Sequence, residues 1–363
     1  MAEIDRLFRA MQAAKGSDLH MLEGQPPKFR VGGNIAAVLG EPALTHAHLT
    51  TLLKEIAPPH QWDKYLRTGD CDFAYAMGSS DRFRANYYKT HAGLGAVCRI
   101  IPTKILTLQE LNTPAKLYDF ARLRSGLVLV TGPTGSGKST TLAAIINEIN
   151  EKQSRHILTV EEPIEFVHPN KSCIITQREV GEHTRSFASA LRAAQREDCD
   201  VILVGEMRDL ETIALAVSAA EMGVLVFGTL HTNSAAKTID RLVNVFPAKQ
   251  QAQIRTMLSG SLRGVVSQIL CRKADGKGRV ACQEIMVSNT AAQAAIRKGD
   301  IAKLNSVISM GRGEGMAAMD DAIQDKLDAK LVTAREAYMK ALDKKRFEPA
   351  MLAENAEQKN THG

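Results

Sequence analysis

The segment "GPTGSGKST", residues 132–140, constrains the fold more than any other part of the chain. It satisfies the pattern G-x-x-x-x-G-K-S/T, follows the apolar run "LVLVT" and precedes the helical pattern "TTLAAIINEIN". In a strand–loop–helix of this kind, backbone N–H groups and the positive end of the helix hold phosphate oxygens. We therefore predict a nucleotide-binding loop that contacts ATP through Gly132, Pro133, Thr134, Gly135, Ser136, Gly137, Lys138, Ser139 and Thr140.

Two side chains of this loop have specific predicted tasks. The Lys138 ammonium is expected to reach the β- and γ-phosphates, and the Ser139 hydroxyl is expected to bind Mg²⁺. The predicted cofactors are therefore ATP and Mg²⁺.

From about residue 118, short apolar runs alternate with helical stretches. The runs are "GLVLVTG", "HILTVEE", "VILVGE" and "VLVFGTLHT". This alternation predicts a mostly parallel α/β sheet, in which ligands bind beyond the carboxyl ends of the strands.

Acidic residues and a histidine follow these predicted strands. Glu161, Glu162 and Glu165 stand within five residues, and carboxylates so close together repel one another and resist desolvation. A cation or a reaction that needs a base would offset that repulsion. Glu206 is predicted to face Mg²⁺, directly or through water, although a surface carboxylate is the alternative. His231 either senses the γ-phosphate or links neighbouring strand ends, and a purely structural role is equally compatible with the sequence.

The remaining parts of the chain differ in pattern. Residues 1–100 mix short helices and strands, and "RFRANYYKTHAGLGAVCRII" predicts a hairpin in which Arg84 and Arg99 are cross-strand neighbours. The proline-flanked segment after it suits a linker. The sequence is helical from about residue 288, and its polar end, residues 348–363, is predicted to be disordered.

Composition excludes several classes of protein. Hydrophobic residues make up 44% and charged residues 24%, as in ordinary globular proteins. A net charge of +6 permits a nucleic-acid partner, but aromatic residues at 5% leave few stacking platforms, so no nucleic acid is expected. The six cysteines form no CxxC pair, which favours reduced thiols and a cytoplasmic location. No transmembrane segment is predicted, because Glu221 and Gly223 interrupt the longest apolar region.

The motifs together resemble a known family. "GPTGSGKSTT", "ILTVEEPIEF", "TQREVG", "LVGEMRDLETI" and "GTLHTNSAAKTIDRL", in this order, are similar to the type II/IV secretion ATPase superfamily, above all to the PilT-like type IV pilus retraction ATPases. The resemblance implies an α/β protein with a PAS-like N-terminal α+β domain (1–100), a linker (101–117), a RecA-like P-loop ATPase core (118–287) and a C-terminal helical part (288–347).

The resemblance also implies roles for individual residues. Glu161–Glu165 form the family's acidic "Asp box", with Glu165 as general base. Glu206 is the Walker B acid and His231 the His-box residue. Four arginines match positions near the nucleotide: Arg192 and Arg196, which sequence spacing places on one helix face, and Arg84 and Arg99, which contact phosphates of an adjacent subunit. Two positions depart from the family pattern, with Glu162 in place of Asp and Cys199 in place of Pro.

The function implied is that of a homo-hexameric motor. Such a motor hydrolyses ATP at the cytoplasmic face of the inner membrane, acts on an inner-membrane platform protein, and drives pilus retraction, pilus disassembly and twitching motility. Extension and type II secretion ATPases carry a tetracysteine insertion and extra N-terminal domains, which we do not expect here. Three alternatives stay open: an accessory retraction ATPase, which is also a candidate partner; a related secretion or DNA-translocating ring; and a nucleotide-binding regulator that does not hydrolyse ATP.

Overall fold

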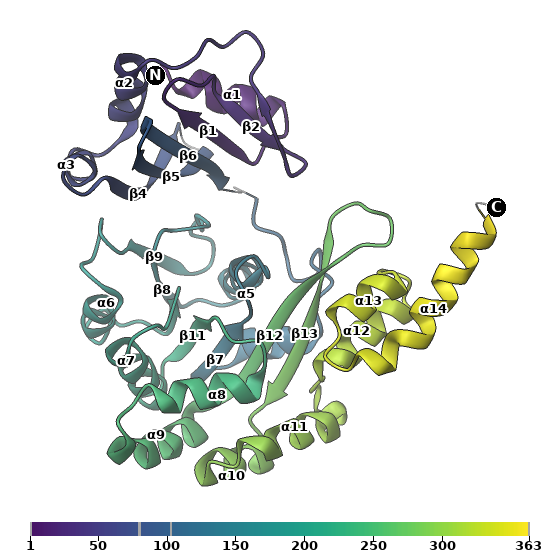
Figure 1. Ribbon diagram of the computed structural model, residues 1–363. Coiled ribbons are helices and arrows are strands. Elements are labelled where there is room, and N and C mark those ends of the chain that lie inside the picture. The colour runs from purple at the N-terminus through teal and green to yellow at the C-terminus, as the bar shows by residue number, and fades with distance from the viewer. Residues whose placement is uncertain (1, 79–80, 102–103, 362–363) are drawn as a thin grey trace. The chain divides into compact units, whose positions relative to one another are not determined.

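The computed structural model describes residues 2–78, 81–101 and 104–361, and the chain divides into two compact units (Figure 1). The first comprises residues 1–104 and 163–167, and the second comprises residues 105–162 and 168–363. Residues 102–103 of the predicted linker and 362–363 of the predicted tail lie outside the described residues.

The first unit is built on a six-stranded antiparallel sheet in the order β3-β2-β1-β6-β5-β4. Its apolar side chains form one core, in which Phe8 of the first helix stacks on Phe83 with ring centroids 4.0 Å apart. The elements are α1 (Asp5–Ala13), β1 (Asp18–Leu22), β2 (Lys28–Val31), β3 (Asn34–Ala37), α2 (His46–Ile56), α3 (Pro59–Thr68), β4 (Asp70–Met77), β5 (Asp81–Thr90) and β6 (Gly93–Ile101).

The predicted hairpin is formed by β5 and β6. Arg84 and Arg99 are directly opposite partners in its register, which confirms the cross-strand prediction. Because opposite residues of an antiparallel pair project from the same face, both guanidinium groups lie on one side of the sheet.

The second unit contains a seven-stranded sheet in the order β13-β12-β7-β11-β10-β8-β9. All neighbours in it are parallel except β13, which is antiparallel to β12. The four predicted strands lie together in its interior, so the predicted parallel sheet is confirmed. The strands are β7 (Gly126–Thr131), β8 (His156–Glu161), β9 (Ile174–Glu179), β10 (Val201–Val204), β11 (Leu225–Leu230), β12 (Leu262–Arg272) and β13 (Arg279–Val287).

Helices cover both faces of this sheet. Along β7 the side chains alternate between two cores: Leu127 and Leu129 belong to one, Val128 and Val130 to the other. A strand buried on both faces reads as the continuous apolar run seen in the sequence. The helices are α4 (Lys116–Arg122), α5 (Lys138–Lys152), α6 (Phe187–Ala194), α7 (Leu210–Glu221), α8 (Ala235–Asn244), α9 (Ala248–Ser261), α10 (Thr290–Lys298) and α11 (Ile301–Met310).

The C-terminal part differs from its prediction. The segment expected to be disordered from residue 348 continues a helix, α14 (Lys344–Thr361), which follows the 3₁₀ turn Gly311–Glu314, α12 (Met319–Asp328) and α13 (Ala334–Lys340). Contacts hold the start of this helix, where Phe347 is buried and Arg346 pairs with Asp321 at 2.6 Å. Beyond residue 348, Glu354 accepts from the Arg335 N–H at 2.8 Å. No helix among the residues described is long and apolar enough to cross a membrane.

Candidate active site

The predicted phosphate loop joins the end of β7 to the first turn of α5. The backbone φ angles of Gly132, Gly135 and Gly137 are 146°, 77° and 85°. Residues other than glycine rarely adopt φ angles in this range. The Lys138 ammonium donates to the carbonyl oxygens of Gly132 at 2.8 Å and Pro133 at 3.1 Å. The loop is therefore folded around the lysine, in the curled form that phosphate binding requires.

Two of these glycines also lack room for a side chain. A Cβ at Gly132 would lie 2.3 Å from the carbonyl oxygen of Gln268, and one at Gly137 would lie 2.9 Å from Nε2 of the same residue. The buried Ser136 hydroxyl has no hydrogen-bond partner in the part of the chain that the structure describes. A loop with an unsatisfied buried hydroxyl and aligned glycines fits a ligand that brings its own oxygen atoms, as a phosphate does.

Glu206 follows β10 and is the centre of a charged cluster. Arg208 pairs with its carboxylate, and His231 Nε2, which follows β11, lies 3.2 Å from Glu206 Oε1. Burial opposes ionisation of Glu206, but Arg208 and His231 outweigh it and lower its pKa below the ordinary value. The structure thus brings Glu206 and His231 together from adjacent strands. The pairing partner Arg208, two residues after the acid, was not anticipated.

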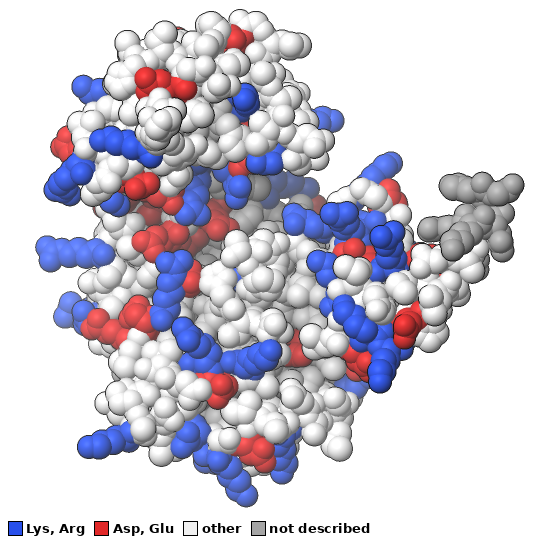
Figure 2. Space-filling view, viewed as in Figure 1, with Lys and Arg blue, Asp and Glu red and all other residues white. Residues whose placement is uncertain are grey.

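The crowded carboxylates of the acidic segment have different surroundings. Glu161 accepts hydrogen bonds from the Thr159 hydroxyl at 2.8 Å and the Gln177 amide at 3.3 Å, whereas Glu162 is exposed to water. Figure 2 shows carboxylates gathered in the part of the second unit where β8 and β9 are labelled in Figure 1. Hydrogen bonds from Thr159 and Gln177 stabilise the Glu161 carboxylate, and water solvates that of Glu162, so the repulsion between the two carboxylates is reduced. Glu165 is exposed and lies in residues 163–167, which group with the first unit, so its role stays a prediction.

The structure corrects the predicted helix face of Arg192 and Arg196, whereas their position near the nucleotide stays a prediction. Arg192 lies in α6 and pairs with Glu211 of α7. The helix ends at Ala194, and Arg196 lies beyond it in a turn, where its backbone N–H donates to the Ala193 carbonyl. The two arginines are therefore not on one face of a continuous helix, because the helical pattern "FASALRAAQRED" extends past the last helical residue.

The two arginines of the first unit are each paired with a carboxylate. Arg99 Nε donates to Asp18 Oδ1 at 2.7 Å, and Arg84 Nε donates to both Asp72 oxygens at 3.1 Å. Burial opposes ionisation of Asp18, but Ser17 and Arg99 hydrogen bonds lower its pKa overall. The side chains of Arg84 and Arg99 remain 45% and 68% exposed, so both can reach an external anion without leaving the sheet face.

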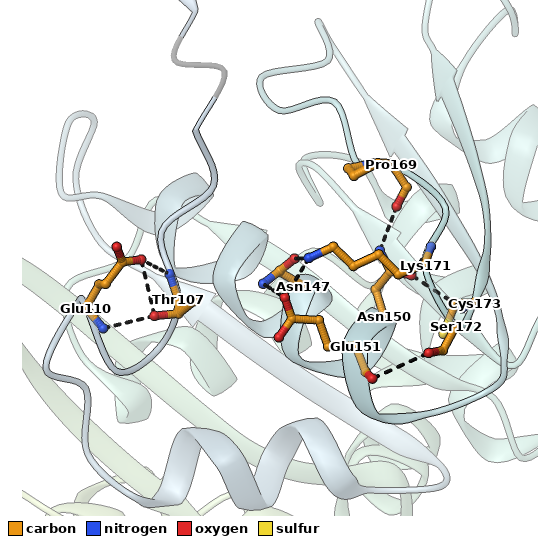
Figure 3. Close-up of polar contacts among 9 residues, drawn as sticks. All are labelled: Thr107, Glu110, Asn147, Asn150, Glu151, Pro169, Lys171, Ser172 and Cys173. Carbon is orange, nitrogen blue, oxygen red and sulfur yellow. Dashed lines mark hydrogen bonds and ion pairs between the residues drawn. The ribbon is translucent and has the colours of Figure 1, made fainter.

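The C-terminal turns of α5, the helix that follows the phosphate loop, hold the segment before β9 through hydrogen bonds and an ion pair. Figure 3 shows Asn147, Asn150 and Glu151 of α5 pointing toward this segment. Asn150 is fully buried and accepts from the N–H groups of Lys171 at 3.1 Å and Cys173 at 3.3 Å, while Lys171 Nζ lies 2.6 Å from Glu151. Since α5 begins at Lys138, the helix that presents the phosphate loop also fixes the chain that leaves the acidic segment.

A phosphate loop at the end of a central parallel strand, with an acid and a histidine on the neighbouring strand ends, defines a P-loop nucleotide-binding protein. The family model for type II/IV secretion system proteins matches residues 3–358, so the chain belongs to that family. The relatives that match this chain include a pilus retraction ATPase and a retraction motor with bound ADP, and this chain is an ATPase that binds nucleotide.

Within this family, the chain is similar to two ATPases of type IV pili and to a solved structure of a retraction motor. The chain is 47% identical over 334 residues to the type IV pilus retraction ATPase PilT of Pseudomonas aeruginosa, covering 92% of this chain and 96% of that protein. It is 37% identical over 321 residues to the type IV pilus ATPase PilU of the same organism, covering 88% and 84%. A crystal structure of the retraction motor PilT with bound ADP aligns with a TM-score of 0.88 and 41% identity, over 96% of this chain and 99% of that one. These findings confirm the predicted resemblance and fold class.

Proposed function

We propose that the chain is the ATP-driven motor of type IV pilus retraction. The observation that carries the proposal is the similarity to PilT across both units, together with a folded phosphate loop beside the Glu206–His231 pair. The accessory role is the weaker candidate, because identity to PilU is 37% against 47% to PilT. The aromatic content of 5% weighs against DNA translocation, because it leaves few side chains on which bases could stack.

ATP hydrolysis would divide the chemistry among a few side chains. Lys138 exchanges its loop carbonyls for the β- and γ-phosphates, and Glu165 accepts a proton from the attacking water. No group of three or more His, Cys, Asp or Glu side chains in the described ranges could hold a metal ion alone. Mg²⁺ typically combines one or two protein oxygens with phosphate oxygens and offsets their charge, which suits Ser139 and Glu206, directly or through water.

The Glu206 cluster supplies a means of sensing the bound nucleotide. Arg208 is 66% exposed at its side chain and competes with any cation for the Glu206 carboxylate. Because Arg208 and His231 both contact the Glu206 carboxylate, its use as a Mg²⁺ ligand, directly or through water, would compete with both contacts. His231 precedes α8, so a change at Glu206 would also affect the segment that leads into that helix.

A ring of six chains would complete the site. In this proposal, Arg84 and Arg99 of one subunit contact the phosphates bound by its neighbour, which couples hydrolysis to movement between subunits. Their exposure and their carboxylate partners, which hold them on one sheet face, are compatible with this role. The motor would work at the cytoplasmic face of the inner membrane against a platform protein, with a second retraction ATPase as a further partner.

Mixed rings test the shared site. Arg99→Ala and Glu165→Gln subunits are each expected to be inactive alone, and a mixture is expected to regain ATPase activity. The reason is that some mixed interfaces combine an intact arginine with an intact carboxylate. Co-assembly is verified by native mass spectrometry, and co-assembled mixtures no more active than the separate variants would exclude action across subunits.

A deletion strain tests the direction of the motor. Cells without the protein should keep their pili, in greater number than wild type, and should lose surface motility, because assembly continues while removal stops. Pili are counted by electron microscopy and motility is measured on agar, with the wild-type gene restored as control. A bald strain would mean that the motor builds pili, and normal pili with normal motility would point to the accessory role.

A further inference from the structure

The β12–β13 hairpin carries two buried glutamines, of which one contacts the phosphate loop and the other contacts the first. Gln268 of β12 and Gln283 of β13 are 2% and 3% exposed and are directly opposite partners in the hairpin register. Gln268 Nε2 donates to the Ser136 carbonyl at 2.6 Å. Its Oε1 accepts from the Thr141 hydroxyl at 2.8 Å and from Gln283 Nε2 at 2.7 Å.

The chemistry of the partners fixes the orientation of the Gln268 amide. The Ser136 carbonyl can only accept, so it requires the NH₂ side of the amide, which leaves Oε1 toward the two donors. Thr141 lies in the first turn of α5 and Ser136 in the loop before it. One side chain therefore bridges the loop and the helix that the loop begins, and Gln283 holds that side chain in place.

The hairpin is itself anchored on its other face. Consecutive residues of a strand point to opposite faces, and Glu284 accepts from the Ala235 N–H, the first residue of α8, at 2.6 Å. Strand β13 therefore supports Gln268 through Gln283, and it contacts the first residue of the helix after His231 through Glu284. Strand β13 can therefore hold Gln268, and through it the phosphate loop, in a fixed position relative to α8.

We propose that Gln268 and Gln283 are positioning residues, which hold the phosphate loop in its nucleotide-binding conformation from the β12–β13 hairpin. Neither side chain contacts phosphate in this role. Gln283 acts through Gln268, and Gln268 acts through the Ser136 carbonyl and Thr141. The inference rests on the proposed nucleotide site at residues 132–140.

Binding of a fluorescent ADP analogue to the full-length chain tests the inference. Gln268→Met removes three hydrogen bonds and should weaken binding on the order of tenfold, and Gln283→Met removes one and should weaken it about threefold. Since Gln283 acts through Gln268, the double variant should bind as weakly as Gln268→Met alone. The KM for ATP should rise in parallel, while thermal unfolding identifies any general loss of stability.

Two controls separate the possible failures. Cys282→Ala alters the fully buried neighbour of Gln283, whose thiol points to the other face of β13 and lies 3.5 Å from Cys271. It should lower stability without changing ADP affinity. Lys138→Ala should weaken binding in the same assay, and if it does not, the proposed nucleotide site is wrong. If Lys138→Ala weakens binding but Gln283→Met binds like wild type, or the two glutamine effects simply add, the positioning role is overturned.

Discussion

Lys138→Ala is expected to abolish ATP hydrolysis. Lys138 is the side chain through which the phosphate loop itself brings a positive charge to its centre, as the 2.8 and 3.1 Å contacts to Gly132 and Pro133 indicate. Charge-assisted hydrogen bonds contribute about 1.5–3 kcal/mol, so nucleotide affinity should fall by a factor on the order of 10 to 100. Affinity is measured with a fluorescent nucleotide and turnover by phosphate release.

A matched control lies at the other end of the same helix. Lys152→Ala removes an exposed ammonium from the last turn of α5, and it should leave both affinity and turnover near wild type. Thermal unfolding shows whether Lys138→Ala lowers stability, because the substitution removes the hydrogen bonds to the Gly132 and Pro133 carbonyls. Appreciable hydrolysis in a folded Lys138→Ala variant would mean that the chemistry occurs away from this loop.

Glu165→Gln should separate binding from chemistry. The substitution preserves size and removes the ability to accept a proton, so nucleotide affinity should stay within about twofold of wild type while kcat falls by about 10²–10⁴. Steady-state phosphate release and nucleotide titration on the same preparation measure the two quantities.

Substitutions of the two neighbouring carboxylates, Glu161 and Glu162, are needed to interpret a Glu165→Gln variant that keeps its turnover. Glu161→Gln and Glu162→Gln are assayed in parallel, because the three acids were indistinguishable on spacing alone. Near-normal turnover in Glu165→Gln with a large loss in one of the others would move the base to that position. Glu161 already accepts hydrogen bonds from Thr159 and Gln177, which makes it less available than Glu162 to accept a proton from water.

Local patterns in the sequence were sufficient to predict much of this protein. The phosphate loop was readable because its glycines, lysine and flanking strand and helix are contiguous. Strands buried on both faces were readable because they are apolar throughout, as in β7 and β11. The pairing of Arg84 with Arg99 followed from hairpin symmetry about a short turn.

Features that depend on distant contacts were not predicted. Strand β12 was missed because Ser267 and Gln268 interrupt its apolar run, and only the folded chain supplies the partners that allow both to be buried. The end of α6 at Ala194 was not predicted, because the helical pattern continues past that residue. The continuation of α14 past residue 348 includes a contact with another helix, since Glu354 accepts from the Arg335 N–H at 2.8 Å. The same limit hid Arg208, whose pairing with Glu206 has no periodic signature.

Time-lapse imaging of fluorescently labelled pili in living cells tests the central claim most directly. Cells in which Glu165→Gln replaces the wild-type protein are compared with wild-type cells, with protein levels matched by immunoblotting. If nucleotide hydrolysis at this site drives retraction, the variant cells should extend pili at the normal rate and fail to shorten them. Pili that shorten at the wild-type frequency and speed in the variant, or cells that make no pili at all, would contradict the account.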